Sequence, residues 1–103
     1  MKRTKSMVYV DSPEAVELYL CAVNNGDCYH RIQSVYQNLL RKWSKGQYDN
    51  DRAVEAWYYI ADAEAQIYFK DFGYRFTVTE KWSAAVKLEE HYREYLINGD
   101  ENV

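Results

Sequence analysis

Residues 48–73 read YDNDRAVEAWYYIADAEAQIYFKDFG, and this stretch decides the fold. Its apolar side chains recur at steps of three and four residues, which is the period of an α-helix with one buried face. The members of this stripe are Ala53, Val54, Trp57, Ile60, Ala61, Ala65, Tyr68 and Phe72. Small side chains alternate with large ones, so a neighbouring helix can approach closely. N-cap candidates lie between Tyr48 and Asp51 and Gly73 supplies a stop, which predicts a helix over about 50–72.

Two further helices are expected before this stretch, and the first covers about 12–24. Asp11 is its predicted N-cap, with Glu14 three residues later and Pro13 inside the first turn, where the missing N–H costs nothing. Its predicted apolar stripe consists of Val16, Tyr19, Leu20 and Val23.

The next helix is expected over about 27–45, with Asp27 as its cap and a wide apolar face. That face consists of Ile32, Val35, Tyr36, Leu39, Leu40 and Trp43. Basic residues gather in its last turns, where cations complement the helix dipole, and Gly46 suits the left-handed position that follows a helix.

The last helix is expected over about 78–97, where Thr77 and Glu80 have the spacing of a capping box. The predicted buried face consists of Trp82, Ala85, Val86, Leu88, Tyr92 and Leu96. The residues predicted to face water are Lys81, Lys87, Glu90, Arg93 and Glu94.

Four amphipathic helices joined by short connections predict an all-α, single-domain bundle, in an up-down arrangement or a close variant. We expect residues 1–10 to be a basic N-terminal arm with a short extended run at 7–10, residues 11–98 to be the helical bundle domain, and residues 99–103 to be a frayed tail. The chain contains no apolar run near the ~18 residues that a membrane span needs. Two cysteines and the absence of a secretion leader at Met1 favour a reducing cytoplasm.

Charge is distributed unevenly along the 103 residues. The first ten carry three basic side chains, whereas residues 11–103 have a net charge of −6, within a total of −3. An acidic body argues against broad binding to a phosphate backbone. Eleven tyrosines are the other unusual feature, and they suit either half-buried core positions or anchors at an interface.

No motif for catalysis is visible. The serines lack a nucleophile turn, and the four scattered glycines form neither a phosphate-binding loop nor a dinucleotide fingerprint. Asp27, Cys28 and His30 lie within one turn and His91 lies far along the chain, which leaves a metal-dependent enzyme or sensor as an alternative. A helix cap, a small buried hydrophobe and a histidine at the rim explain the first three residues more simply than a metal does, so we expect no cofactor and no enzyme.

Two surfaces are candidates for binding. Glu55 and Asp62 lie seven residues apart on one face of the 50–72 helix, and with Tyr58 and Tyr59 they predict an acidic, tyrosine-rich strip that engages a protein partner. Trp43 is a further candidate contact. A purely solvated outer face, which would also hold Glu64 and Asp71, is the simpler interpretation of the acidic residues. The second surface is basic and would contact nucleic acid through Lys2, Arg3, Lys5, Arg41, Lys42 and Lys45.

Residues 17–95 contain the segments ELYL (17–20), NGDCY (25–29), NLLRK (38–42), KGQYD (45–49) and RAV (52–54). In order and spacing these segments resemble a loose group of small helical proteins encoded by bacteriophages, for which no activity is known. The resemblance implies a viral origin and a role in the cytoplasm of an infected bacterial host.

The leading functional hypothesis is therefore a small non-enzymatic phage protein that binds and inhibits or redirects a host protein. Host defence machinery, in the manner of an anti-CRISPR or anti-restriction protein, is one target class. The alternative is a nucleic-acid-binding accessory protein that uses the N-terminal arm and the Arg41–Lys45 patch. Self-association into a homodimer through exposed tyrosines is compatible with either hypothesis.

Overall fold

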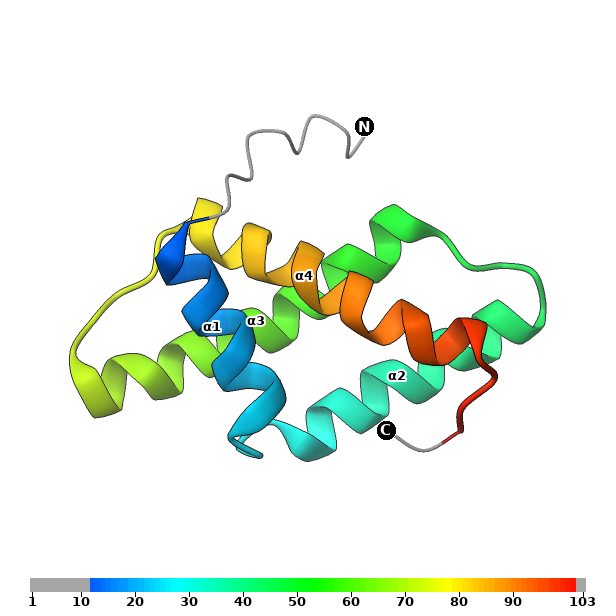
Figure 1. Ribbon diagram of the computed structural model, residues 1–103, viewed down its shortest axis with the longest axis horizontal. Coiled ribbons are helices and arrows are strands. Elements are labelled where there is room, and N and C mark those ends of the chain that lie inside the picture. Colours follow the sequence, from blue (N-terminus) through cyan, green and yellow to red (C-terminus); the bar gives the residue numbers. More distant parts are fainter. Residues whose placement is uncertain (1–11, 102–103) are drawn as a thin grey trace.

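The computed structural model describes residues 12–101, which form four helices: α1 (Pro13–Asn24), α2 (Tyr29–Ser44), α3 (Asn50–Phe72) and α4 (Val78–Ile97) (Figure 1). The predicted all-α helical bundle is confirmed, and each helix begins and ends within two residues of its predicted bounds. The basic arm, the extended run at 7–10 and Asp11 lie outside the described residues. None of the four helices has the length and apolar character needed to cross a membrane.

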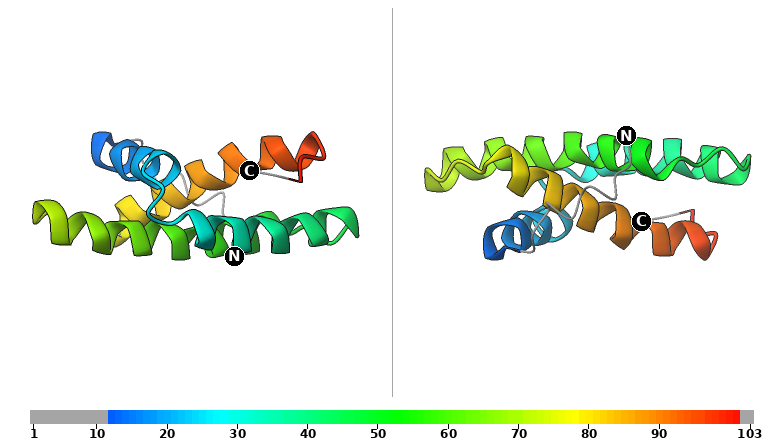
Figure 2. Two further views of the ribbon diagram at one scale, coloured as in Figure 1. Left: turned by 90° about the horizontal axis from the view of Figure 1, so that it is seen from below. Right: turned by 90° about the horizontal axis from the view of Figure 1, so that it is seen from above.

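The helices lie in two layers, with α2 and α3 in one and α1 and α4 in the other (Figure 2). Helix α4 crosses over α3 when the layers are viewed face-on (Figure 1). The Cα extents of 41 × 30 × 16 Å describe a flat molecule. The fold is thus a crossed variant of the bundle, and its core is the set of side chains held between the layers.

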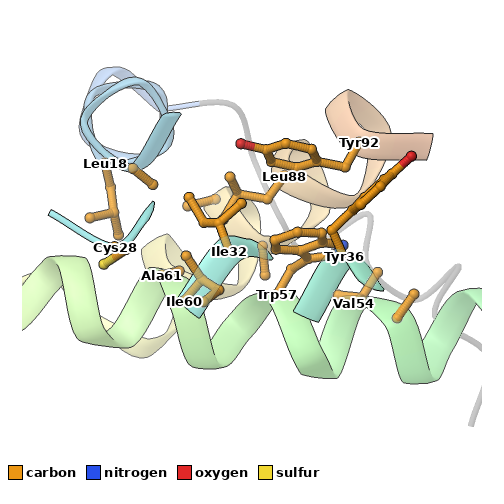
Figure 3. Packing of buried hydrophobic residues seen from close by; sticks show 14 of the residues in the cluster. Leu18, Cys28, Ile32, Tyr36, Val54, Trp57, Ile60, Ala61, Leu88 and Tyr92 are labelled. Atoms are coloured by element: carbon orange, nitrogen blue, oxygen red, sulfur yellow. The ribbon is translucent and has the colours of Figure 1, made fainter. Parts of the chain in front are cut away.

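The centre of the core is aromatic (Figure 3). The Trp57 ring of α3 stacks on the Tyr92 ring of α4, with centroids 4.6 Å apart and planes 14° apart, and Tyr36 of α2 lies beside Tyr92 at 6.3 Å. Small buried residues let the helices pack closely around these rings. They are Ala15 and Ala22 on α1, Ala53, Ala61 and Ala65 on α3, and Ser83, Ala84 and Ala85 on α4.

Two predicted N-caps require correction. Ser12 caps α1, because its side chain accepts a hydrogen bond of 3.1 Å from the Ala15 backbone N–H. Asp27 does not cap α2: the N-cap residue is Cys28 and no side chain fills that role. A turn at Gly26, closed by the bond from the Tyr29 backbone N–H to the Gly26 carbonyl at 3.2 Å, precedes the helix. Asp27 lies within this turn, one residue before the N-cap position.

The other predicted helix ends are confirmed. Thr77 and Glu80 form the capping box of α4, with bonds of 3.1 and 2.9 Å, and Asp49 caps α3. Gly46 has a φ of 70°, and two bonds close the end of α2 there: Gly46 N–H to Trp43 C=O at 3.1 Å and Gln47 N–H to Lys42 C=O at 2.8 Å.

Residues 99–101, part of the predicted tail, return towards α2. The Tyr36 hydroxyl donates to the Asp100 carbonyl, and the Gln37 amide donates to the Glu101 carbonyl at 2.8 Å. These bonds attach the end of the described chain to the middle of α2.

The buried faces of α1 and α3 differ in part from the predicted stripes. On α1 the fully buried residues are Ala15, Leu18 and Ala22, whereas Leu20 is exposed. Apolar residues of α1 occupy most of the circumference of the helix, so their periodicity alone does not select a buried face. Phe72 continues the α3 stripe but is 71% exposed, because the last turn of α3 extends beyond the helices that cover the rest of its stripe (Figure 1).

On α4, Trp82 and Val86 are half-buried at the margin of the predicted face. Lys81 and Arg93, which were expected to face water, instead form ion pairs with Asp62 and Glu89. Both cations lie at the edge of the helix, where their long stems reach carboxylates of the packed layers.

Candidate functional site

The outer face of α3 is defined here by Glu55, Tyr59, Asp62, Gln66 and Phe69, which follow one another at steps of four, three, four and three residues. These steps place all five on one side of the helix, opposite the buried stripe. Tyr59 is 58% exposed and Phe69 is 38% exposed. At ~1.5 Å per residue, the two rings are separated by about 15 Å along the helix axis. The face therefore presents two aromatic anchors between polar side chains.

Asp62 is not a free negative charge on this face. The Lys81 ammonium of α4 donates to Asp62 Oδ1 at 2.8 Å, and the Gln66 amide donates to Asp62 Oδ2 at 3.0 Å. The hydrogen bond with Asp62 raises the pKa of Lys81 above its ordinary value. Because the positive charge of Lys81 neutralises the negative charge of Asp62, the strip is less acidic than its sequence indicates. Glu55 remains as its exposed carboxylate.

Tyr58, a predicted partner contact, is half-buried at the margin of the face. Its ring stacks on Trp82 of α4 at 4.1 Å with an interplanar angle of 26°, and the Lys81 ammonium lies 5.9 Å from the ring centroid. Tyr58 therefore joins α3 to α4. Only the neighbouring tyrosine, Tyr59, presents most of its ring to the surface.

Trp43, the remaining predicted contact, lies in a different part of the molecule. Its ring meets the edge of Tyr48 at 5.0 Å and packs against the core, while the Tyr48 hydroxyl donates to Glu89 of α4 at 2.7 Å. The structure thus places Trp43 in the corner between α2, α3 and α4. It brings together Glu55, Tyr59 and Asp62, with Tyr58 beside them.

A groove of about 300 Å³ runs between the outer face of α3 and the start of α4. Its lining residues are Asp62, Ala65, Gln66, Phe69, Lys70, Arg75, Phe76 and Lys81. The Arg75 guanidinium lies over the Phe69 ring at 4.2 Å from the centroid. This groove gives the outer face a recess beside its second aromatic anchor.

The basic patch of the nucleic-acid hypothesis is divided by the structure. Arg41, Lys42 and Lys45 are exposed at the end of α2, whereas Lys2, Arg3 and Lys5 lie outside the described residues. Lys42 lines a groove of about 250 Å³ between α2 and α3 whose other lining residues include Asp49. A carboxylate beside the cations makes this surface mixed in charge.

The metal hypothesis has no counterpart in residues 12–101, where no group of three or more His, Cys, Asp or Glu side chains could hold a metal ion. Cys28 is buried, and its thiol donates to Glu64 at 3.6 Å. His91 is held by Tyr19, whose hydroxyl lies 2.9 Å from Nδ1. Burial raises the pKa of the Cys28 and Cys21 thiols to about 11, so at neutral pH both are protonated and weakly nucleophilic.

Two buried carboxylates were missed by the sequence reasoning. Glu64, expected on the solvated face of its helix, is buried, and Glu89 of α4 is fully buried. The sequence contained the signal for both. Glu64 follows Trp57 by seven residues and Ile60 by four, so it lies at the centre of the apolar stripe, and Glu89 lies between Ala85 and Tyr92 in the same way.

No protein-family model, curated protein or solved structure was found to match this chain.

Proposed function

We propose that this protein acts without catalysis, by binding another protein through the outer face of α3. The observation that carries the proposal is the exposed ring of Tyr59, on the same helix face as a groove lined by Phe69. The Arg75 guanidinium covers one side of the Phe69 ring, which leaves that ring partly exposed. Rigid aromatic anchors beside a recess are the features that dominate binding energy at protein interfaces. The exposed Glu55 adds a negative group at the rim.

We further propose that the partner is a protein of an infected bacterial host, which this chain inhibits or redirects. The likeness of residues 17–95 to bacteriophage proteins supports this part of the proposal, and CRISPR effectors and restriction enzymes form the first target class to examine. The tagged chain would be used to capture proteins from bacterial lysate after nuclease treatment, at two salt concentrations.

The decisive comparison is between two tyrosine variants. Tyr59→Ala removes an anchor of the outer face, whereas Tyr29→Ala removes a comparably exposed ring from the start of α2. We expect both variants to fold and only Tyr59→Ala to lose the captured protein, with a loss of about 2 kcal/mol, or roughly 30-fold in Kd, once the partner is purified. Equal capture by wild type and Tyr59→Ala would contradict the proposal. Capture of nucleic acid that is lost at high salt would support the alternative function instead.

A further inference from the structure

A second groove, of about 490 Å³, lies at the far end of α3, beside the first turns of α1 and the 73–77 linker (Figure 1). Its lining residues are Pro13, Glu14, Glu17, Tyr68, Phe72, Tyr74 and Phe76. Four of the seven are aromatic and two are carboxylates. We call this surface the aromatic groove.

The rings of the aromatic groove form a connected cluster. Tyr68 lies 4.6 Å from Phe72 and 5.0 Å from Phe76, and Tyr74 lies 4.8 Å from Phe76, between ring centroids. Phe76 is buried and anchors the cluster, whereas Phe72 and Tyr74 are 71% and 40% exposed. The groove therefore offers open ring faces and edges on a fixed base.

Carboxylates border these rings. Glu14 and Glu17 belong to the groove lining, and the Tyr74 hydroxyl donates to both carboxylate oxygens of Glu80 at 3.2 Å. Burial, followed by the nearby charge of Glu17, raises the pKa of the Tyr68 hydroxyl above its ordinary value. The rim of the groove is therefore negative.

None of the groove-lining residues carries a positive charge. The nearest basic residue along the linker, Arg75, packs instead on Phe69, with its guanidinium 4.2 Å from that ring centroid. Phe69 and Phe72 lie one turn apart on α3. The Phe69 ring contacts a guanidinium of this chain, whereas the Phe72 ring is exposed and lies in a groove with two carboxylates.

We infer that the aromatic groove binds a guanidinium or ammonium group, presented as an Arg or Lys side chain by a basic segment of a partner protein. Aromatic faces attract cations through their quadrupole, and the attraction is strongest where carboxylates add a complementary charge. The negative rim matches such a segment and repels acidic ones. The groove contains none of the five residues that define the outer face of α3, although the buried Phe76 lines both this groove and the recess beside that face. Phe72 continues the apolar stripe and lies about 20 Å along the helix from Tyr59.

The test is calorimetric titration of the full chain with an acetylated and amidated hexa-arginine peptide, and with hexaglutamate as the reverse-charge probe. We expect saturable binding of hexa-arginine and none of hexaglutamate. Phe72→Ala should weaken the binding by about 3- to 30-fold, which corresponds to one cation–π contact. Because Phe72 is largely exposed, this variant keeps the core, and circular dichroism would verify its fold.

The matched control separates the groove from general attraction to an acidic protein. Glu17→Gln and Glu55→Gln each remove one charge from an exposed helix position, the first in the groove and the second on the outer face of α3. We expect only Glu17→Gln to weaken hexa-arginine binding. Equal effects of the two variants, or unchanged binding by Phe72→Ala, would overturn the inference. The inference would also be overturned if the chain bound no peptide and instead formed a dimer that Phe72→Ala dissociates, because a second copy would then occupy the groove.

The result is independent of the proposed function. Tyr59→Ala should bind hexa-arginine as wild type does, since Tyr59 is not part of the groove. Failure of the peptide to bind would remove the inference and leave the proposal for the outer face of α3 standing.

Discussion

The buried carboxylate of Glu89 is expected to be the most sensitive polar position in this protein. It is fully buried and accepts four hydrogen bonds: from the Tyr48 hydroxyl at 2.7 Å, from the Asn50 amide at 2.8 Å, and from Arg93 Nε and Nη2 at 2.9 and 2.8 Å. The bond with Glu89 also raises the pKa of Arg93. Through this one side chain, α4 is joined to the connection between α2 and α3 and to the first turn of α3. The informative change is Glu89→Gln, which keeps the size and shape of the side chain.

The magnitude follows from the donors that would remain. All four of these hydrogen bonds are donated to Glu89, so the new amide NH₂ would face donors and Arg93 would lose its counter-charge. Removing one member of a buried ion pair costs about 3–5 kcal/mol, and a hydrogen bond to a charged group contributes about 1.5–3 kcal/mol. The Arg93 side chain is 39% exposed and can be rehydrated, which lowers the cost. We therefore expect Glu89→Gln to reduce the free energy of unfolding by about 2–3 kcal/mol.

Urea denaturation followed by circular dichroism would measure this loss, and in a thermal scan it corresponds to a Tm lower by about 10–20 °C. Glu90→Gln is the control, because it makes the same change of charge at an exposed neighbour and should alter stability by less than about 0.5 kcal/mol. If Glu89→Gln and Glu90→Gln have the same small effect, the four bonds do not stabilise the fold. A double variant with Arg93→Gln should lose less than the sum of the single changes, because the two side chains act on each other.

Three further predictions concern protons and the backbone. Burial lowers the pKa of His91, so the unfolded chain takes up the proton first and stability should fall as the pH drops through about 6.5. His91→Gln should flatten the urea-derived stability between pH 7 and 5, whereas the exposed His30→Gln should not. Burial raises the pKa of Glu64, so the folded protein holds this proton more tightly than the unfolded chain does. The resulting stability is fully present below the ordinary pKa of a glutamate and is lost as the pH rises through the folded pKa, and between these two values Glu64→Gln should gain free energy of unfolding relative to wild type by at most about 1.4 kcal/mol per pH unit. Identical pH profiles of the two proteins would refute the assignment. Gly73 has a φ of 77° with open space around it, so Gly73→Ala should cost about 1 kcal/mol from conformation alone, and an unchanged urea midpoint would show that the turn relaxes.

The helix ends were predictable because the interactions that fix them are local. The capping box of Thr77 and Glu80 spans three residues, and Gly46 ends α2 through bonds to residues within the preceding turn. Where the prediction failed, at Asp27, a turn at the neighbouring glycine precedes the helix, which begins at Tyr29 and has Cys28 at its N-cap position.

The buried faces were predictable only where polar residues delimit them. The apolar face of α2 was identified, because charged and amide side chains flank it, whereas α1 is apolar around most of its circumference and its face depends on the neighbouring helices. Phe72 shows a different limit. Its spacing is correct for burial, but exposure depends on where the covering helices end, and that is a property of the crossed layers.

The candidate site was predicted in part for the same reason. The spacing of Glu55 and Asp62 placed them correctly on one face of their helix, and Tyr59 lies on the same face. The pairing of Asp62 with Lys81, 19 residues away across a linker, and the stacking of Tyr58 on Trp82 depend on how α4 crosses α3. These two contacts determine the charge and the aromatic content of the face, and no local pattern specifies them.

The tyrosine content has a mainly structural explanation, and this narrows the surface available to a partner. Of the ten tyrosines in residues 12–101, only Tyr29, Tyr59 and Tyr74 are exposed. The others place their rings in or against the core, and several use the hydroxyl at the rim: Tyr48 with Glu89, Tyr36 with the Asp100 carbonyl, Tyr19 with His91. A flat two-layer fold has much rim for its volume, and tyrosine suits positions where one end of a side chain is dry and the other is polar. Because most tyrosines serve packing, exposed rings lie beside a recess at the outer face of α3 and at the aromatic groove. Substitutions at these two surfaces should therefore change binding without changing folding.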